Sequence, residues 1–419
     1  MMLKNKISSI LNNNKILIQN FSYLSVLQVL NLVIPLLVYP YLIRFLGSDV
    51  FGLVIFAQAI ISYLVIVVSY GFNISGAKAI SINRTDKNEV SKIFSSIFFI
   101  KLILLLIIIL VLMGLINIVP SLKENKVLFL LTLWMCLYDI FFPIWYFQGI
   151  EQMKYITFIS LVMKSFFLIS VFLFIKSPAD YLLVPIINIV GTILSGLVAF
   201  YIIIFKHKVK IYRPKLADIK SELKSSTPIF LSNVSIQIYV ATNKVIVGFF
   251  IGMESVTYYD LSEKILTFLR TPQTVLSQAI FPKVSKEKNI KFVKNIFKIS
   301  VIGNVLLILI AFIFSSFIVQ FLLNGEVHKD AVLLLKILLV TIPIIGMSNV
   351  FGIQTLIPFG YNKLFSKAVL LSGLFYLILV LIVWGMYNFT IFNVAYITVA
   401  TEMFVTVYMF YLCKKYKLW

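Results

Sequence analysis

Charged residues are scarce in this sequence, and acidic residues are the scarcest. Of the 419 residues only 13% are charged, with 16 Asp or Glu against 37 Lys or Arg. Hydrophobic residues make up 61% of the chain, and the mean hydropathy is +1.02. A soluble domain does not need so large a share of apolar side chains. The composition therefore excludes an ordinary soluble protein and predicts one that crosses a membrane several times.

Cysteine and histidine are nearly absent. Cys136 and Cys413 lie in or beside apolar runs, and His207 and His328 fall in different loops. This scarcity excludes a disulfide framework and a metal site with zinc-type spacing. The sequence also has no Gly-rich phosphate loop followed by Lys-Ser/Thr, and no nucleophile elbow. The residues give no support for a cofactor, a metal or soluble-type catalysis.

Long hydrophobic runs occupy most of the chain. Residues Met1 to Lys15 are polar and basic, and the run after them is about twice the length of a signal-peptide core and lacks a cleavage site, so we interpret it as a retained first span. Runs of about 20 apolar residues are long enough to cross a bilayer. We predict about twelve spans, near residues 17–45, 51–80, 92–118, 127–149, 154–175, 182–205, 226–251, 255–281, 296–322, 331–357, 364–387 and 390–412.

Lysine and arginine are distributed unevenly among the gaps between these spans. If the N-terminus is inside and the spans alternate, the inside segments hold 26 of the 37 basic residues, the outside segments hold 5, and 6 lie within spans. Because basic loops stay on the cytoplasmic side, both termini are predicted to be cytoplasmic. The same pattern accounts for the net charge of +21 without nucleic-acid binding. No gap is long enough to fold as a separate domain.

One basic stretch divides the chain into two nearly equal halves. It runs from Lys206 to Lys224, contains Pro214, and is too polar for the hydrocarbon core. Each half has a turn in which an apolar run ends in a hydrophobe and Gly, at Gly47 and at Gly252, 205 residues apart. Duplicated bundles are a recurring plan among transporters. We predict an N-terminal six-helix lobe over 1–205, a basic cytoplasmic linker over 206–224 and a C-terminal six-helix lobe over 225–419.

Ionisable residues within the spans require an explanation, because a charge in hydrocarbon costs several kcal/mol. Lys101 and Lys336 lie near the ends of their helices, and we interpret them as snorkelling to the headgroups. Lys164 is deeper in its span. Asp139 and Glu402 lie near mid-span, where each either pairs with a cation on another helix or, as a lone buried carboxylate, carries a proton.

The eighth predicted span is the richest in charge. Asp260 and Lys264 have the spacing of a helical ion pair, and Glu263 and Arg270 lie on an adjacent stripe. Four charges on neighbouring faces of one helix cannot all face lipid, so they line a hydrated cavity or form a buried network. Neutralisation of Asp260 by Lys264 between packed helices explains that pair as well as a transport role does. Arg270 is the better candidate for a ligand contact, and Lys244 on the preceding span is a further candidate.

The stretch Phe142–Met153, with the sequence FPIWYFQGIEQM, carries a specific motif. It resembles the Pro-x-Trp-x-Phe-Gln-Gly-x-Glu-x-Met signature of bacterial polysaccharide (O-antigen, Wzx-type) flippases of the multidrug/oligosaccharidyl-lipid/polysaccharide (MOP) exporter superfamily. Weaker matches are YLIRFLG at Tyr41–Gly47, FPK at Phe281–Lys283, and Asn243-Lys244, where the family usually has Asp before the basic residue. We expect the signature to have a structural role. Its residues are Pro143, Trp145, Phe147, Gln148, Gly149, Glu151 and Met153.

The resemblance implies an all-α integral membrane protein with about twelve transmembrane helices in two six-helix lobes around a central cavity, as in MATE transporters. It implies a non-enzymatic flippase of the bacterial cytoplasmic (inner) membrane. This protein would move undecaprenyl-pyrophosphate-linked oligosaccharide to the outer leaflet by alternating access. Its partners would be that substrate, membrane lipids and other polysaccharide-assembly proteins, without nucleic acid. The alternatives are a drug or other lipid exporter of the superfamily, or a polysaccharide polymerase, which would need a large external loop.

The resemblance also gives roles to the charges within the spans. Cations in a low-dielectric cavity would bind the pyrophosphate. The carboxylates would serve in coupling or in charge pairs. The candidate cations are Lys244, Lys264, Arg270 and Lys164, and the candidate acids are Asp139, Asp260, Glu263 and Glu402.

Overall fold

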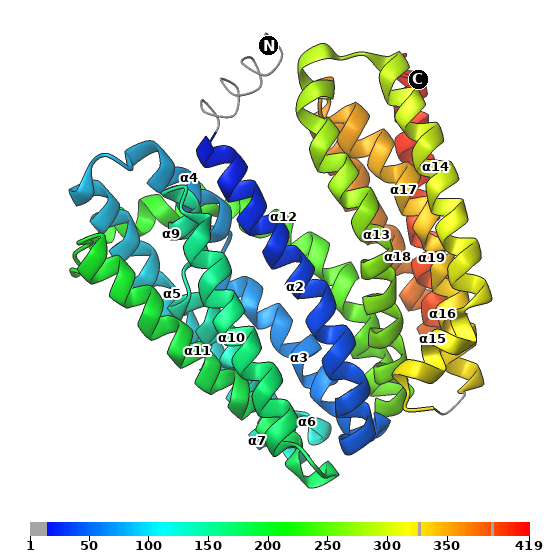
Figure 1. The fold of residues 1–419 in the computed structure, drawn as a ribbon, viewed down its shortest axis with the longest axis horizontal. Coiled ribbons are helices and arrows are strands. Elements are labelled where there is room, and N and C mark those ends of the chain that lie inside the picture. The colour runs from blue at the N-terminus through cyan, green and yellow to red at the C-terminus, as the bar shows by residue number, and fades with distance from the viewer. Residues whose placement is uncertain (1–14, 326–327, 387–388) are drawn as a thin grey trace, which may run out of the picture. The chain divides into compact units, whose positions relative to one another are not determined.

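The chain folds into helices joined by short turns (Figure 1) in a computed structural model that describes residues 15–325, 328–386 and 389–419. The side chains of residues 15–18, 21, 235, 236 and 238–240 are outside this description. The described residues contain no β-strand. By length and composition, ten of the described segments could cross a membrane: Ser22–Leu46, Ser48–Asn83, Lys87–Ile118, Lys126–Gly149, Met153–Phe174, Pro178–Lys206, Ile290–Ile313, Lys329–Leu356, Asn362–Gly385 and Ile391–Lys415.

The other two predicted spans lie on α12 (Leu216–Phe250) and α13 (Met253–Glu287). Each helix has 35 residues, enough for about 50 Å at 1.5 Å per residue. The charged residues of α13 make it more polar than the ten apolar segments. The predicted all-α membrane protein is confirmed.

Two compact units pack separately. Unit 1 contains the described residues up to Val38 together with Ile60–Val234, and unit 2 contains Tyr39–Ala59 and Ser235–Trp419. Three helices have residues in both units, namely α2 (Lys15–Leu46), α3 (Ser48–Ser69) and α12. The lobes at 1–205 and 225–419 stay a prediction. The last part of the predicted linker is helical, because α12 begins at Leu216.

Unit 1 is built around a buried aromatic core at Trp145, which packs with Phe94 and Tyr146. The close packing of α4 against α9 and of α10 against α11 encloses this core. Besides the shared helices, unit 1 contains α4 (Phe72–Asn83), α5 (Lys87–Ile118), α6 (Pro120–Glu124), α7 (Lys126–Thr132), α8 (Trp134–Phe141), α9 (Ile144–Gly149), α10 (Met153–Phe174), η1 (Pro178–Leu182), α11 (Leu183–Tyr201) and η2 (Ile202–Lys206).

In unit 2, α19 is the central packing partner, in contact with α16, α17 and α18. One core cluster of this unit joins Phe351, Leu356 and Met409. Besides the shared helices, unit 2 contains α13, α14 (Ile290–Ile313), α15 (Ser315–Leu322), α16 (Lys329–Leu339), α17 (Thr341–Phe351), η3 (Gly352–Leu356), α18 (Asn362–Gly385) and α19 (Ile391–Lys415).

Helix starts are fixed by residues that the local sequence supplies. The Asp86 carboxylate accepts hydrogen bonds from the backbone N–H groups of Asn88 and Glu89 at the start of α5. The Thr390 hydroxyl accepts a hydrogen bond from the Asn393 N–H at the start of α19.

Large apolar side chains point outward along the helices, such as Leu110, which is 70% exposed. In a bilayer such side chains contact acyl chains.

Candidate functional site

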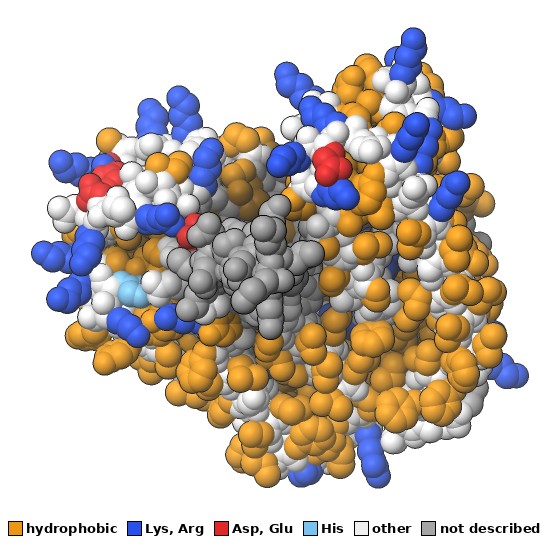
Figure 2. All heavy atoms as spheres, turned by 45° about the horizontal axis from the view of Figure 1, so that its top comes forward, with side chains coloured by type: hydrophobic (Ala, Val, Ile, Leu, Met, Phe, Trp, Pro, Cys, Tyr) orange, Lys and Arg blue, Asp and Glu red, His pale blue; other side chains and the backbone are white. Residues whose placement is uncertain are grey.

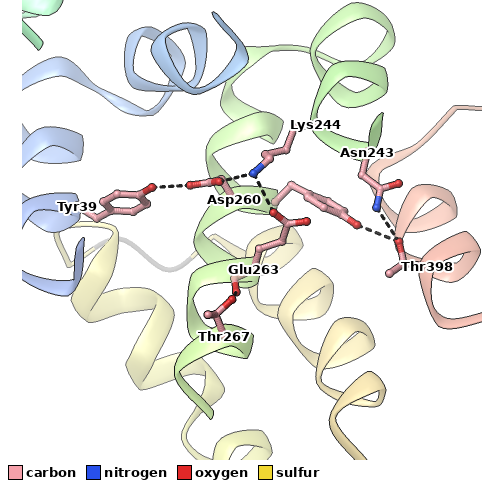
Figure 3. A network of polar contacts seen from close by, with 8 residues as sticks. Tyr39, Asn243, Lys244, Asp260, Glu263, Thr267 and Thr398 are labelled. Carbon is pink, nitrogen blue, oxygen red and sulfur yellow. Dashed lines mark hydrogen bonds and ion pairs between the residues drawn. The ribbon is translucent and has the colours of Figure 1, made fainter. Parts of the chain in front are cut away.

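Polar side chains from α2, α12 and α13 meet within unit 2 (Figure 3). The Lys244 ammonium on α12 lies 2.9 Å from Oδ1 of Asp260 and 3.0 Å from Oε2 of Glu263, both on α13. The Tyr39 hydroxyl on α2 donates to Oδ2 of Asp260 at 2.7 Å. We name these four residues the Lys244 network. Its members come from three helices, so only the folded bundle assembles it.

The local sequence explains why Lys244 reaches both carboxylates. Asp260 and Glu263 are three residues apart on a helix and therefore share a face. The chain reverses between α12 and α13 at Gly252, whose φ of +138° is unfavourable for residues with a Cβ. Close packing also requires Gly248, because a Cβ there would lie 2.2 Å from Cδ2 of Phe56. The turn and the close approach together hold Lys244 beside Asp260 and Glu263.

Burial differs among the three charged members. The side chain of Asp260 is 4% exposed, that of Lys244 is 18% exposed and that of Glu263 is 28% exposed. A buried charge is tolerated when it is paired and hydrogen-bonded, and Asp260 has both Lys244 and Tyr39 as partners. Glu263 is the carboxylate that an incoming ligand can displace most easily. The arrangement can exchange an internal anion for an external one on Lys244.

A second, uncharged group of polar residues adjoins this network. The Asn243 amide donates to the Thr398 hydroxyl at 3.0 Å, and Tyr376 donates to the Asn243 amide oxygen at 2.7 Å. The Tyr259 hydroxyl lies 3.0 Å from the Thr398 hydroxyl. Asn243, Tyr259 and Tyr376 are all buried. The side chain that stands where the resembling family usually has Asp thus acts as a structural connector between α12, α18 and α19.

Lys264 and Arg270 also lie on α13, and their roles in substrate binding stay predictions. The structure does not show the alternative in which Lys264 neutralises Asp260: Asp260 pairs with Lys244, and among the described carboxylates none lies within ion-pair distance of Lys264. Lys244 lies on the neighbouring helix α12, and its side chain points across the contact between α12 and α13 toward Asp260. Arg270 donates through Nη2 to the Thr341 hydroxyl on α17.

In unit 1, the interpretation of Lys101 as a snorkelling residue is wrong. Its side chain is 2% exposed, and its ammonium lies 2.7 Å from Oδ2 and 3.0 Å from the backbone oxygen of Asp139. The structure thus shows the pairing alternative for Asp139, not the lone carboxylate. Sequence position alone could not separate these cases, because the partner is 38 residues away on another helix.

The remaining candidates are placed as follows. Lys164 lies partly buried on α10 in unit 1, and Glu402 is 8% exposed on α19 in unit 2. Lys336 lies on α16 with its ammonium 5.5 Å from the centre of the Phe312 ring. The roles of Lys164 and Glu402 in substrate binding and coupling stay predictions.

The motif at residues 143–153 places its aromatic side chains in the core of unit 1. Trp145 and Phe147 on α9 are at most 1% exposed. A Cβ on Gly149 would lie 2.6 Å from Cβ of Ile80 on α4, so only Gly permits this packing. Pro143 precedes α9, Gln148 lies within it, and a short loop with Glu151 follows it before Met153 begins α10.

Hydrogen bonds and one ion pair fix that loop. Glu151 adopts a positive φ of 58°, and its carboxylate pairs with Arg84 at 2.8 Å. Asn20 on α2 donates to the backbone oxygen of Glu151 at 2.9 Å and accepts from the Met153 N–H at 3.3 Å. These contacts join α2, α4 and α9 and support the structural role expected for the motif.

Sequence reasoning missed Tyr39, Tyr376 and Thr398. Tyr39 is 221 residues from Asp260 along the chain, and Thr398 is 155 residues from Asn243. Single uncharged polar residues in apolar runs are common and carry no distinguishing pattern, so no signal in the sequence could have selected them.

The chain is similar to known proteins over most of its length. The family described as "Polysaccharide biosynthesis protein" matches residues 17–288. A relative from Escherichia coli (strain K12), named "Putative O-antigen transporter", is 29% identical over 378 residues, which cover 88% of this chain and 91% of the relative. A relative of the same name from Shigella dysenteriae is 24% identical over 353 residues, covering 83% and 88%.

Solved structures show the same fold. An inward-facing multidrug resistance MATE family transporter of the MOP superfamily matches with a TM-score of 0.73 at 14% identity, over 91% of this chain and 94% of that one. The lipid II flippase MurJ in an inward closed conformation matches with a TM-score of 0.72 at 16% identity, over 94% and 87%. The chain therefore belongs to the polysaccharide biosynthesis protein family and has the fold of the MOP superfamily transporters.

Proposed function

We propose that this protein is a flippase for an undecaprenyl-pyrophosphate-linked oligosaccharide. It works in the bacterial cytoplasmic membrane, with both termini in the cytoplasm, and moves its substrate to the outer leaflet by alternating access. Membership of the polysaccharide biosynthesis protein family, with two relatives named as O-antigen transporters, supports the substrate class. The structural observation that carries the proposal is the Lys244 network, a set of charges inside an apolar helical unit.

The charges near Lys244 suit an anionic headgroup. Lys244, Lys264 and Arg270 are three cations, and Asp260 and Glu263 are two carboxylates, so the set has one positive charge in excess when all are ionised. A pyrophosphate oxygen that replaces the Glu263 carboxylate keeps Lys244 paired. Hydrogen bonds to charged groups contribute about 1.5–3 kcal/mol each where water is excluded. The lipid tail of such a substrate can remain in the bilayer.

This exchange gives the protein a way to respond to substrate. A ligand shifts a conformational equilibrium only by the difference in its affinity for the two states. Substrate on Lys244 and Glu263 on Lys244 are mutually exclusive, so substrate binds the state in which the Lys244–Glu263 contact is open. Asp260 stays with Tyr39 in both states and keeps the Lys244 side chain oriented. Release of the substrate restores the Lys244–Glu263 ion pair.

Complementation of a strain that lacks its own flippase tests the proposal, with the amount of protein measured for each variant. We expect Arg270→Ala and Lys244→Met to reduce surface polysaccharide at least tenfold, since each removes about one charge-assisted contact. Arg270→Lys keeps the positive charge but loses the paired N–H groups of the guanidinium. It should retain part of the activity if charge matters more than bidentate hydrogen bonding. Lys367→Ala, an exposed lysine on α18, is the matched control and should complement fully.

Two outcomes would contradict the proposal. Full complementation by Arg270→Ala and Lys244→Met, at normal protein levels, would place the cationic site elsewhere. If the wild-type chain fails to complement but confers resistance to cationic drugs, the protein is a drug exporter of the same superfamily.

A further inference from the structure

Unit 1 contains a second polar site, separate from the residues discussed above as transport candidates. A pocket of about 490 Å³ opens at one end of this unit. Basic and polar side chains line it, contributed by the α4–α5 turn, by α9 with its following loop, and by the end of η2. Those used below are Arg84, Lys87, Tyr146, Gln152, Lys206 and His207. We name this site the His207 pocket.

The backbone after η2 places His207 at the pocket wall. The His207 N–H donates to the Ile202 oxygen at 2.9 Å, and the Val209 N–H donates to the Ile203 oxygen at 3.1 Å. Lys208 between them adopts a positive φ of 59°. The side chain of His207 is then held by the Tyr146 hydroxyl, 3.0 Å from its Nδ1. Tyr146 is buried in the aromatic core, so this contact joins the pocket wall to the core of unit 1.

The charges around the pocket are mostly positive. Lys87 and Lys206 line it, and among its described lining residues there is no carboxylate. Lys154 is also near: its ammonium and that of Lys206 lie 5.1 and 5.3 Å from the centre of the Tyr155 ring. Figure 2 shows Lys and Arg side chains gathered, with a histidine among them, at this end of unit 1 (left in the view).

The acids nearby already have partners. Arg84, which lines the pocket, pairs with Glu151 at 2.8 Å. Asp86 caps α5 through its Oδ1. The pKa of His207 is lowered by burial and further by the charges of Lys206 and Lys154. The positive charges that lower this pKa also favour the binding of an anion.

We propose that the His207 pocket binds the phosphate group of an anionic phospholipid headgroup. Lys and Arg side chains bind phosphate through charge-assisted hydrogen bonds, and Gln152 adds amide donors. A volume of about 490 Å³ is within the range of small-molecule sites and holds a headgroup. A soluble phosphorylated molecule has the same chemistry. The lipid is favoured because the pocket lies at the ends of helices whose apolar surfaces are suited to a bilayer. This proposal does not depend on which substrate the protein transports.

Histidine NMR on the full-length protein tests the proposal directly, because the chain has only His207 and His328. The protein, labelled in its histidine rings, is placed in nanodiscs of phosphatidylcholine with increasing phosphatidylglycerol. A bound phosphate stabilises the imidazolium, so the pKa of His207 should rise as phosphatidylglycerol is added. His328 reports the general effect of a negative membrane surface and should shift less.

Variants separate a site from general surface charge. Lys87→Gln/Lys206→Gln should raise the phosphatidylglycerol fraction needed for half of the His207 shift by about tenfold or more, the loss expected from removing charge-assisted contacts. Lys220→Gln/Lys224→Gln removes two exposed lysines of α12 that do not line the pocket and should leave the midpoint unchanged. Equal pKa shifts at both histidines, or equal effects of the two double variants, would overturn the proposal.

A second arm identifies the source of the phosphate. Glycerol phosphate is added to the protein in pure phosphatidylcholine nanodiscs. No shift of the His207 pKa at millimolar concentration supports the lipid as ligand. A full shift there shows that the pocket takes a soluble phosphate and overturns the lipid assignment.

Discussion

Lys101 and Lys244 are buried lysines that satisfy the same physical requirement in different units. Each ammonium lies within 3.0 Å of a carboxylate oxygen from another helix. Lys101 has one acidic partner and is almost completely enclosed, whereas Lys244 has two and keeps some exposure. A fully enclosed, singly paired charge has no capacity to accept a ligand. We therefore expect Lys101 to contribute to stability, whereas Lys244 fits the substrate exchange proposed above.

The residue scale gives a stability prediction for Lys101. Lys101→Met leaves the Asp139 carboxylate inside unit 1 without its cation, which should destabilise the protein by about 3–5 kcal/mol. Lys101→Met/Asp139→Leu removes both charges and should recover most of this loss, because two apolar side chains replace a neutral pair. Thermal unfolding of the purified protein in detergent measures both. If the single variant melts like the wild type, the ion pair does not contribute as described.

At the scale of elements, glycine determines how closely α4 and α9 approach. A Cβ on Gly149 would lie 2.8 Å from the backbone oxygen of Ala77 as well as 2.6 Å from Cβ of Ile80. A Cβ on Gly76 would lie 2.9 Å from the Trp145 ring. Small residues on both helices thus allow α4 and α9 to approach closely, which is a common means of association between membrane helices.

We predict that Gly149→Ala lowers stability by about 1–3 kcal/mol, because the backbone of α4 must move to accommodate the methyl group. Gly114→Ala on α5 is the matched control, since nothing lies within 4 Å of a Cβ there. That control should be neutral or slightly stabilising, as Gly is a poor helix former. Tm values of both variants in detergent decide the matter, and equal Tm values would show that α4 and α9 are not tightly packed.

At the scale of the whole molecule, the distribution of basic residues predicts the orientation in the membrane. The 26 Lys and Arg residues of the predicted inside segments against 5 outside favour cytoplasmic termini. We predict that a reporter active only in the cytoplasm is active when fused after Trp419. The same reporter fused after Asn324, in a predicted outside gap, should be inactive. Activity at Asn324 and not at Trp419 would invert the topology.

The sequence by itself determined the class of this protein and its polar helix. Apolar content is a local property, so runs of hydrophobic residues identify helices that span a membrane without any knowledge of their packing. The motif from Pro143 to Met153 pointed to the family for the same reason, because its residues are contiguous. The charges of α13 were also visible, since spacing on one helix fixes which side chains share a face.

Only the tertiary structure decided which charges are partners. Lys264 is a possible cationic partner for Asp260 four residues away on the same helix. Asp260 pairs instead with Lys244, which is sixteen residues away on the preceding helix α12. Lys101 finds Asp139 in the same manner, and Tyr39 completes the network from another helix. Pairing depends on the distance between side chains of different helices, and that distance is set by packing against residues such as Gly248 and Phe56. Spacing along one helix contains no information about this packing.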